Sequence, residues 1–89
     1  MSGLTNNENI WHCYLVQCAD NTFYTGITNN LQKRIAAHNL GTASKYTRCR
    51  LPVQIVYSET HANRSHASKR EAQIKRFSRA KKLDLIASY

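Results

Sequence analysis

The sequence has little proline, glycine or tryptophan, with one, three and one residue among its 89, and it has no long apolar run. No segment approaches the roughly 20 apolar residues that a membrane-spanning helix needs. The N-terminal MSGLTNNEN lacks the basic start and apolar centre of a signal peptide, so we expect an intracellular, cytoplasmic protein. The single proline, Pro52, opens an apolar run and marks no linker. Without repeats or low-complexity blocks, the chain is expected to form one continuous domain.

Cysteine is also scarce, and its count is odd, with Cys13, Cys18 and Cys49. In a chain without an export signal, this pattern argues against a disulfide framework and favours reduced thiols. Four residues separate Cys13 from Cys18, whereas most zinc knuckles have two, and His12 is the only imidazole nearby. We therefore expect the thiols to pack as small apolar groups.

Acidic residues are few, with 5 Asp and Glu against 13 Lys and Arg, so the formal net charge is +8. A polyanion is the natural partner of such a chain, and nucleic acid binding through counterion release is the expected form. Eighty-nine residues can form one modest core and leave room for one site. Basic side chains are concentrated in two stretches, which contain Lys45, Arg48, Arg50, Lys69, Arg70, Lys75, Arg76, Arg79, Lys81 and Lys82.

Two segments rich in aromatic and β-branched residues, 11–18 and 22–28, predict a hairpin with a tight turn at 19–21. The loop length decides which side chains share a face. A two-residue turn would send Tyr14 and Tyr24 to opposite faces, whereas an odd-length loop with a bulge would place them on one face. The sequence leaves both registers open. In the odd register, one face carries Tyr14, Tyr24, Gly26 and Thr28, and the other carries Cys13, Leu15, Phe23 and Ile27.

A helix and a basic loop are expected next. Polar residues 28–30 can cap a helix that ends before the stop signal Gly41. Arg34 lies on this helix one turn before His38, so the two side chains are neighbours. The segment ASKYTRCR, residues 43–50, is expected to be a basic loop.

The second half of the chain predicts one strand and two helices. Pro52 to Glu59 is expected to be the third strand, with one side formed by Val53, Ile55 and Tyr57. Asn63 or Ser65 can cap the next helix, one stripe of which holds Ala67, Glu71, Ile74 and Ser78. Ser78 can cap a last helix, whose expected buried positions are Ala80, Leu83 and Ile86.

Glu71 is the most informative acidic residue, because burying an unpaired carboxylate costs several kcal/mol. It could pair with Arg70, Lys75 or Arg34, or it could be exposed. It could instead bind a divalent metal, since Mg²⁺ is often held by one or two carboxylates with water and substrate phosphate.

Arg34, His38 and the two tyrosines each have an ordinary structural interpretation as well. Arg34 could clamp a phosphate or extend past its neighbours to water, and His38 could cap a helix end. Phosphodiester hydrolysis needs a base for water, a cation for the phosphorane and a metal, so the combination favours this chemistry. Phenol is a weak base at its ordinary pKa of about 10, but nearby cations lower that pKa.

In this order, Tyr14, the triplet Tyr24-Thr25-Gly26, Arg34, His38 and Glu71 resemble the GIY-YIG nuclease domain. The resemblance extends from about Trp11 to Ile86 and is closest to the small stand-alone bacterial members. It implies an α+β fold with a small three-stranded antiparallel sheet flanked by helices. We accordingly expect residues 1–10 to be a flexible tail and residues 11–89 to be a single nuclease-like domain.

The resemblance also implies roles for individual residues. Glu71 would bind one Mg²⁺ or Mn²⁺ ion, and Arg34 would stabilise the phosphate. Tyr14 is the expected base, although members of the family differ on this point, and Tyr24 would orient water or phosphate. His38 and Tyr46 would be supporting donors, and Gly26 would allow close approach of the backbone or the DNA. The residues expected to contact substrate are Gly26, Lys45, Arg48, Arg50, Lys75 and Arg76.

The chain departs from the family pattern at two places. His12-Cys13-Tyr14 stands where the family name implies Gly-Ile-Tyr, so only the tyrosine of that motif is retained. Longer members also use a late asparagine, and no asparagine follows Asn63. The first departure affects strand-supporting residues, and the second leaves less to hold the metal or the far edge of the fold.

The expected function is a metal-dependent DNA endonuclease that selects structure more than sequence, in DNA repair or recombination. The alternative is a catalytically weak or inactive module that binds DNA or RNA. The basic residues suit either function, whereas Arg34 and Glu71 favour the enzyme, because a pure binding module needs no carboxylate where phosphate must approach. A small domain reads little sequence by itself, so a protein partner could supply specificity.

Overall fold

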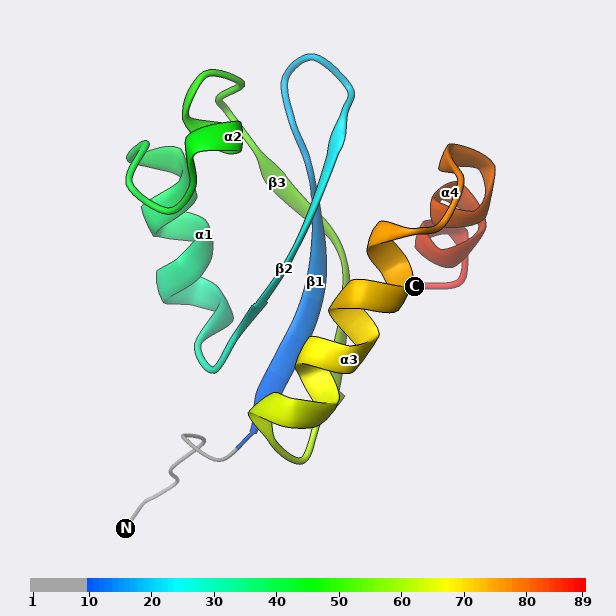
Figure 1. Cartoon of the computed structure of the whole chain (residues 1–89). Coiled ribbons are helices and arrows are strands. Elements are labelled where there is room, and N and C mark those ends of the chain that lie inside the picture. Colours follow the sequence, from blue (N-terminus) through cyan, green and yellow to red (C-terminus); the bar gives the residue numbers. More distant parts are fainter. Residues whose placement is uncertain (1–9) are drawn as a thin grey trace, which may run out of the picture.

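The sheet of this protein has three antiparallel strands in the order β2-β1-β3. The computed structural model describes residues 10–89, so the expected flexible tail falls almost wholly outside the described residues. The strands are β1 (Trp11–Gln17), β2 (Phe23–Thr28) and β3 (Gln54–His61). Helices α1 (Leu31–Asn39) and α2 (Lys45–Arg48) lie on one side of the sheet, and α3 (Arg64–Lys75) and α4 (Arg79–Ala87) lie on the other (Figure 1). The expected α+β architecture is confirmed.

The hairpin turn selects the odd register. The backbone N–H of Asn21 donates to the Cys18 carbonyl at 2.9 Å, and the N–H of Cys18 donates to the Thr22 carbonyl at 2.8 Å. Asn21 has a φ of 67°, a left-handed conformation that asparagine tolerates better than most residues. The resulting three-residue loop pairs Tyr14 with Gly26 and Val16 with Tyr24. Both tyrosines therefore lie on the same face of the sheet.

Strand β3 contains an irregularity that the sequence analysis missed. Leu15 pairs with Tyr57 and Val16 pairs with Ile55, so Val56 is an extra residue between the two pairs. The expectation that Val53, Ile55 and Tyr57 share one side is wrong, because a bulge reverses the alternation of side chains after it. Val53 and Ile55 pack on the tyrosine face, and Val56 and Tyr57 pack on the opposite face.

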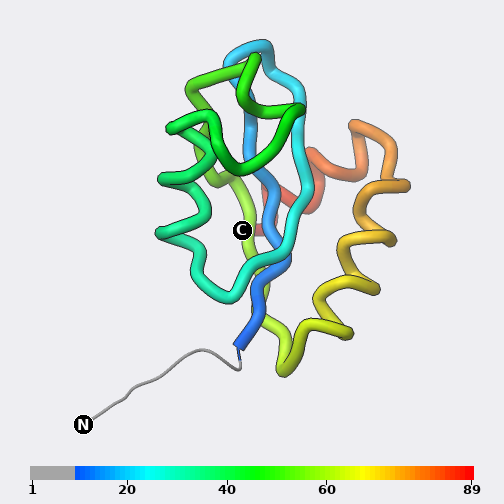
Figure 2. Tube along the Cα trace, turned by 60° about the vertical axis from the view of Figure 1, so that its left-hand side comes forward, coloured from blue at the N-terminus to red at the C-terminus, as the bar shows by residue number. Residues whose placement is uncertain are grey.

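Two small cores result, one on each face of the sheet. The core under α1 and α2 is built from Tyr14, Val16, Cys18 and Val53. The core under α3 and α4 is built from Cys13, Leu15 and Ile74. Figure 2 shows the sheet running between these two helical segments. In residues 10–89 the cysteines are free, with Cys13 and Cys18 buried and Cys49 exposed.

The helices begin mostly where the sequence indicated, but three expectations need correction. Residues 43–50 are not simply a loop, because the Ser44 side chain accepts a hydrogen bond from the Thr47 N–H and starts the short helix α2. Ser78 does not belong to the buried stripe of α3, since it is exposed and caps α4. Ala80 and Leu83 are exposed, Leu83 by 45%, because α4 turns Leu85 and Ile86 toward the core instead.

Across the described part of the chain, residues 10–89, no helix is both long enough and apolar enough to cross a bilayer.

Candidate active site

Tyr14 is packed directly over Gly26 on the neighbouring strand. A Cβ atom at position 26 would lie 2.5 Å from the Tyr14 Oη and 2.6 Å from its Cζ, closer than real Cβ contacts allow. Only glycine therefore leaves room for the ring, which is 2% exposed. The close approach expected at Gly26 is made by the Tyr14 side chain.

His38 fixes the far end of the Tyr14 ring. Its Nε2 lies 2.8 Å from the Tyr14 Oη, and its Nδ1 lies 2.8 Å from the Thr47 Oγ1. The imidazole is 1% exposed, and burial together with the nearby Arg34 guanidinium lowers its pKa. The ring is therefore neutral at neutral pH, and one of its two nitrogens accepts a hydrogen bond.

Tyr24 stands beside the same histidine but is less buried. Its ring meets the His38 ring edge-on, with centroids 5.4 Å apart, and stacks on Tyr46 with centroids 6.0 Å apart. The Arg50 guanidinium lies 3.9 Å from the Tyr46 ring centroid and donates to the Tyr46 carbonyl at 2.8 Å. Arg50 also donates to Asp20 at 3.0 Å, so its charge holds Tyr46 and the hairpin turn together.

Two opposite charges act on the Tyr14 phenol. Burial raises the pKa of Tyr14, the Arg34 guanidinium opposes this rise, and Tyr24 and the Glu71 carboxylate add to it. Arg34 also borders a hollow of about 290 Å³ at the start of α1, which Asn29, Asn30 and Lys33 line with it. Arg34 thus lines a surface cavity and also acts electrostatically on the phenol.

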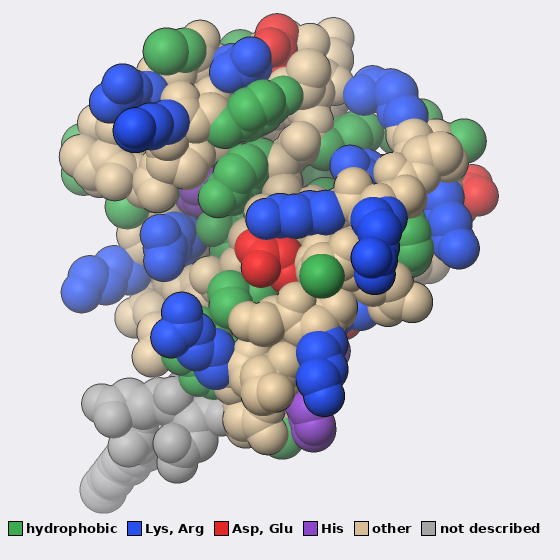
Figure 3. Space-filling model, viewed as in Figure 1, with side chains coloured by type: hydrophobic (Ala, Val, Ile, Leu, Met, Phe, Trp, Pro, Cys, Tyr) green, Lys and Arg blue, Asp and Glu red, His purple; other side chains and the backbone are tan. Residues whose placement is uncertain are grey.

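Glu71 lies on α3, the helix that packs on the other face of the sheet. Its charge acts on both faces, because it raises the pKa of Tyr14 and also contributes, after burial and Glu59, to raising the pKa of Cys13 to about 12. The side chain is 23% exposed, and its Oε2 lies 3.5 Å from Lys75 Nζ. In the view of Figure 3, an acidic side chain lies near the middle of the visible surface, with Lys and Arg side chains on both sides of it.

The Glu71 carboxylate suits a hard divalent cation such as Mg²⁺ better than it suits zinc. Within residues 10–89, no three His, Cys, Asp or Glu side chains are grouped as a metal cage. Zinc sites need three or four such ligands, whereas Mg²⁺ can be held by one carboxylate with water and phosphate. Lys75 holds the Glu71 carboxylate only by a 3.5 Å ion pair, so its oxygens can serve as such a ligand.

The remaining sequence-predicted residues divide into two groups. Lys45, Arg48 and Arg76 are exposed and available to a polyanion, whereas Lys75 and Arg50 already pair with carboxylates. Sequence reasoning missed Thr47, which hydrogen-bonds to the His38 imidazole, and Ser44, which hydrogen-bonds to Thr47. A signal for Ser44 was present, because serine immediately before a helical turn is a typical N-cap.

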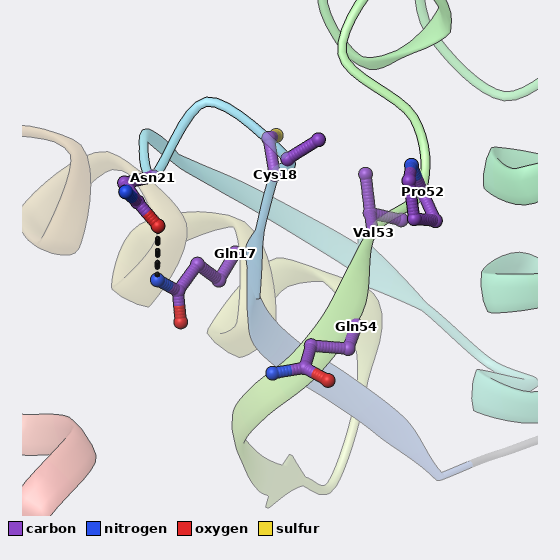
Figure 4. A pocket seen from close by; sticks show the side chains of 7 residues that line it. Gln17, Cys18, Asn21, Pro52, Val53 and Gln54 are labelled. Atoms are coloured by element: carbon purple, nitrogen blue, oxygen red, sulfur yellow. Dashed lines mark hydrogen bonds between the residues drawn. The ribbon is translucent and has the colours of Figure 1, made fainter.

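A second hollow, at the hairpin tip and the start of β3, lies among other residues. Figure 4 shows it, with the Gln17 amide donating to Asn21 at 3.1 Å. Its lining contains no carboxylate and no cationic side chain, and it consists of Gln17, Cys18, Ala19, Asn21, Pro52, Val53 and Gln54. Such a lining offers neither a carboxylate for Mg²⁺ nor a cation for phosphate.

Comparisons with known proteins identify the family of the chain. The model of the GIY-YIG catalytic domain matches residues 10–84. A UPF0213 protein of Staphylococcus haemolyticus is 49% identical over 75 residues, which cover 84% of this chain and 92% of that protein. A UPF0213 protein of Clostridium perfringens is 51% identical, with 86% of this chain and 83% of that protein covered.

Two solution NMR structures are also similar. A protein of E. faecalis matches with a TM-score of 0.63 at 34% identity, covering 94% of this chain and 90% of that one. The UPF0213 protein BH0048 of Bacillus halodurans matches with a TM-score of 0.57 at 33% identity, covering 88% and 83%. The comparisons support a nuclease-like function with nucleic acid as substrate, and the chain belongs to the GIY-YIG catalytic domain family, among its small UPF0213 proteins.

Proposed function

We propose that this protein is a metal-dependent endonuclease that hydrolyses phosphodiester bonds in DNA. The observation that carries the proposal is that the charges of Arg34 and Glu71 both act on the Tyr14 phenol, although the three residues come from three elements. A binding module needs no carboxylate beside a phosphate site, because the two negative groups repel each other.

Each side chain has a distinct part in this proposal. Arg34 binds the scissile phosphate and stabilises the charge that builds on it, since a guanidinium can donate two parallel hydrogen bonds to phosphate oxygens. Glu71 would hold Mg²⁺ or Mn²⁺, which when bound supplies Lewis-acid stabilisation of the phosphate and lowers the pKa of water. Tyr14 takes the proton of the attacking water, and Tyr24 orients the water or the phosphate.

Substrate preference follows from the small size of the surface. Lys45, Arg48 and Arg76 are exposed and can neutralise phosphates, but phosphate contacts carry no sequence information. We therefore propose selection by DNA structure, with a role in DNA repair or recombination, and a protein partner where sequence specificity is required.

The test is cleavage of labelled duplex, single-stranded and branched DNA with Mg²⁺, Mn²⁺ or EDTA. We expect cleavage with a divalent metal, none with EDTA, and loss in Arg34→Ala and Glu71→Gln. Asp84→Asn is the matched control, because it removes an exposed carboxylate that belongs to α4 and not to the site.

Two results would oppose the proposal. Cleavage that persists in both site variants would place the activity elsewhere. DNA binding without cleavage in any metal would identify a binding module instead.

A further inference from the structure

A chain of hydrogen bonds leads from the buried phenol to the surface. The Tyr14 Oη lies 2.8 Å from His38 Nε2, and His38 Nδ1 lies 2.8 Å from Thr47 Oγ1. Thr47 Oγ1 in turn lies 2.9 Å from Ser44 Oγ. Thr47 is 0% exposed, whereas Ser44 is partly exposed, so the outer end of the hydrogen-bond chain belongs to a residue that reaches the surface.

We propose that Thr47 and Ser44 are positioning residues, which set the His38 tautomer and connect the Tyr14 phenol to solvent for proton transfer. The proposal rests on the proposed function in one respect, because a proton path from Tyr14 matters only if that phenol takes part in the reaction. The tautomer itself can be observed without any activity.

The direction of the chain follows from counting donors and acceptors. Ser44 Oγ already accepts the Thr47 backbone N–H at 3.0 Å. If Tyr14 donates to Nε2, then Nδ1–H donates to Thr47 and the Thr47 hydroxyl donates to Ser44, whose own hydroxyl can reach water. Every proton then has an acceptor.

The opposite direction leaves a buried proton without a partner. If Thr47 donated to Nδ1, then Nε2–H would donate to the Tyr14 oxygen, and the Tyr14 O–H would need another acceptor. In residues 10–89, His38 is the only hydrogen-bond partner of the Tyr14 hydroxyl, which belongs to a residue only 2% exposed. An unsatisfied buried donor is unfavourable. Before the reaction, we therefore expect each group of this hydrogen-bond chain to donate to the next one in the direction from Tyr14 to Ser44.

Proton transfer along this chain is balanced and leaves no charge on the imidazole. Nε2 takes the proton of Tyr14 as Nδ1 releases its own to the Thr47 oxygen. Thr47 passes its hydroxyl proton to Ser44, and Ser44 passes one to a solvent water molecule. The phenol becomes phenolate, His38 changes from the Nδ1–H to the Nε2–H tautomer, and the reversed chain then donates to the phenolate. The burial and the Arg34 charge that lower the pKa of His38 favour such a neutral route.

Thr47→Val and Thr47→Ser form the matched pair of variants. Valine keeps the shape of threonine without the hydroxyl, whereas serine keeps the hydroxyl. The main readout is the ¹⁵N NMR spectrum of the imidazoles at pH 8, with the His38 signals assigned by their loss in His38→Gln. We expect mostly Nδ1–H in the wild type, a shift toward Nε2–H in Thr47→Val, and the wild-type pattern in Thr47→Ser.

The kinetic readout separates positioning from simple structural support. We expect kcat to fall about 10- to 100-fold in Thr47→Val, by analogy with the loss seen when the partner that orients a metal-bound histidine is removed, with KM little changed. Thr47→Ser should recover most of the rate.

The outcomes are decisive even if Thr47→Val does not fold. A wild-type spectrum with mostly Nε2–H would overturn the inference, because His38 would then donate to Tyr14 and the direction of the hydrogen bonds would be the opposite of the one proposed. An unchanged tautomer in a folded Thr47→Val variant would do the same. Absence of cleavage by the wild type with an Nδ1–H spectrum would reject the proposed function and leave the assigned tautomer standing, so the two failures can be told apart.

Discussion

Replacing Gly26 with alanine tests whether the packing of Tyr14 against β2 holds the site together. The new Cβ would stand 2.5 Å from the Tyr14 Oη and 2.6 Å from its Cζ, so the ring must move. The ring has little freedom, because it is buried and hydrogen-bonded to His38.

The magnitude follows from three contributions. Overpacking a core costs about 1–3 kcal/mol. Losing the Tyr14–His38 hydrogen bond costs about 0.5–1.5 kcal/mol, and replacing glycine in a strand regains about 0.5–1 kcal/mol. We therefore expect Gly26→Ala to lower the free energy of unfolding by about 2 kcal/mol. Urea unfolding followed by the fluorescence of Trp11, the only tryptophan, measures this.

A double-mutant cycle identifies the cause. Leucine at position 14 lacks the distal ring atoms, so Gly26→Ala should cost little or even stabilise in a Tyr14→Leu background. Gly41→Ala is the control, because Gly41 has a φ of +81° and nothing closer than 3.8 Å to a new Cβ. Its cost of about 1–2 kcal/mol comes from backbone strain and should be the same in both backgrounds. Equal costs of Gly26→Ala in the two backgrounds would refute the steric argument.

Three further predictions concern stability and binding. Burial alone would raise the pKa of Glu59, but hydrogen bonds from Tyr57, His61 and Arg70 lower it, so Glu59→Gln should cost about 1–3 kcal/mol at pH 7. The difference in unfolding free energy between the wild type and Glu59→Gln should shrink as the pH falls through the lowered pKa of Glu59 in the folded state, because protonation of the wild-type carboxylate removes the same stabilisation. A difference that stays constant from pH 7 to pH 3 would contradict this prediction. Asn63→Ala should cost about 1 kcal/mol in urea unfolding, since the Asn63 side chain accepts the His66 N–H at 2.9 Å; no loss would show that the cap is dispensable. If Lys45 and Arg48 contact phosphates, replacing both with Gln should reduce the salt slope of DNA binding by about 2, and an unchanged slope would place the DNA elsewhere.

The hairpin shows how far the sequence could specify the site. Strand composition predicted both strands, and the residue pattern of the turn allowed two registers. The choice depended on Asn21 adopting a φ of 67°, which lengthens the loop to three residues and aligns the two tyrosines. That conformation is accessible to asparagine but not required by it, so local sequence could not decide.

Long-range packing accounts for most of what the sequence did not predict. The bulge at Val56 depends on how β3 pairs with β1, and the position of Leu83 depends on how α4 docks. The contact of Thr47 with His38 joins two segments nine residues apart, between which α1 ends and α2 begins. The sequence placed Glu71 on a stripe of α3, but that its carboxylate raises the pKa of Tyr14 from the opposite helical layer depends on how α3 packs on the sheet.

The two tyrosines occupy environments that impose different requirements on their protons. Tyr24 is partly exposed, so its ring lies nearer to solvent. Tyr14 is enclosed by Gly26 beneath it and His38 at its end, so the burial that raises its pKa also separates its hydroxyl from bulk solvent. A base must lose the proton it has accepted before the next turnover. An enclosed phenol can act repeatedly only if its neighbours carry that proton away, and His38 with the two hydroxyls behind it is the path that the described fold provides.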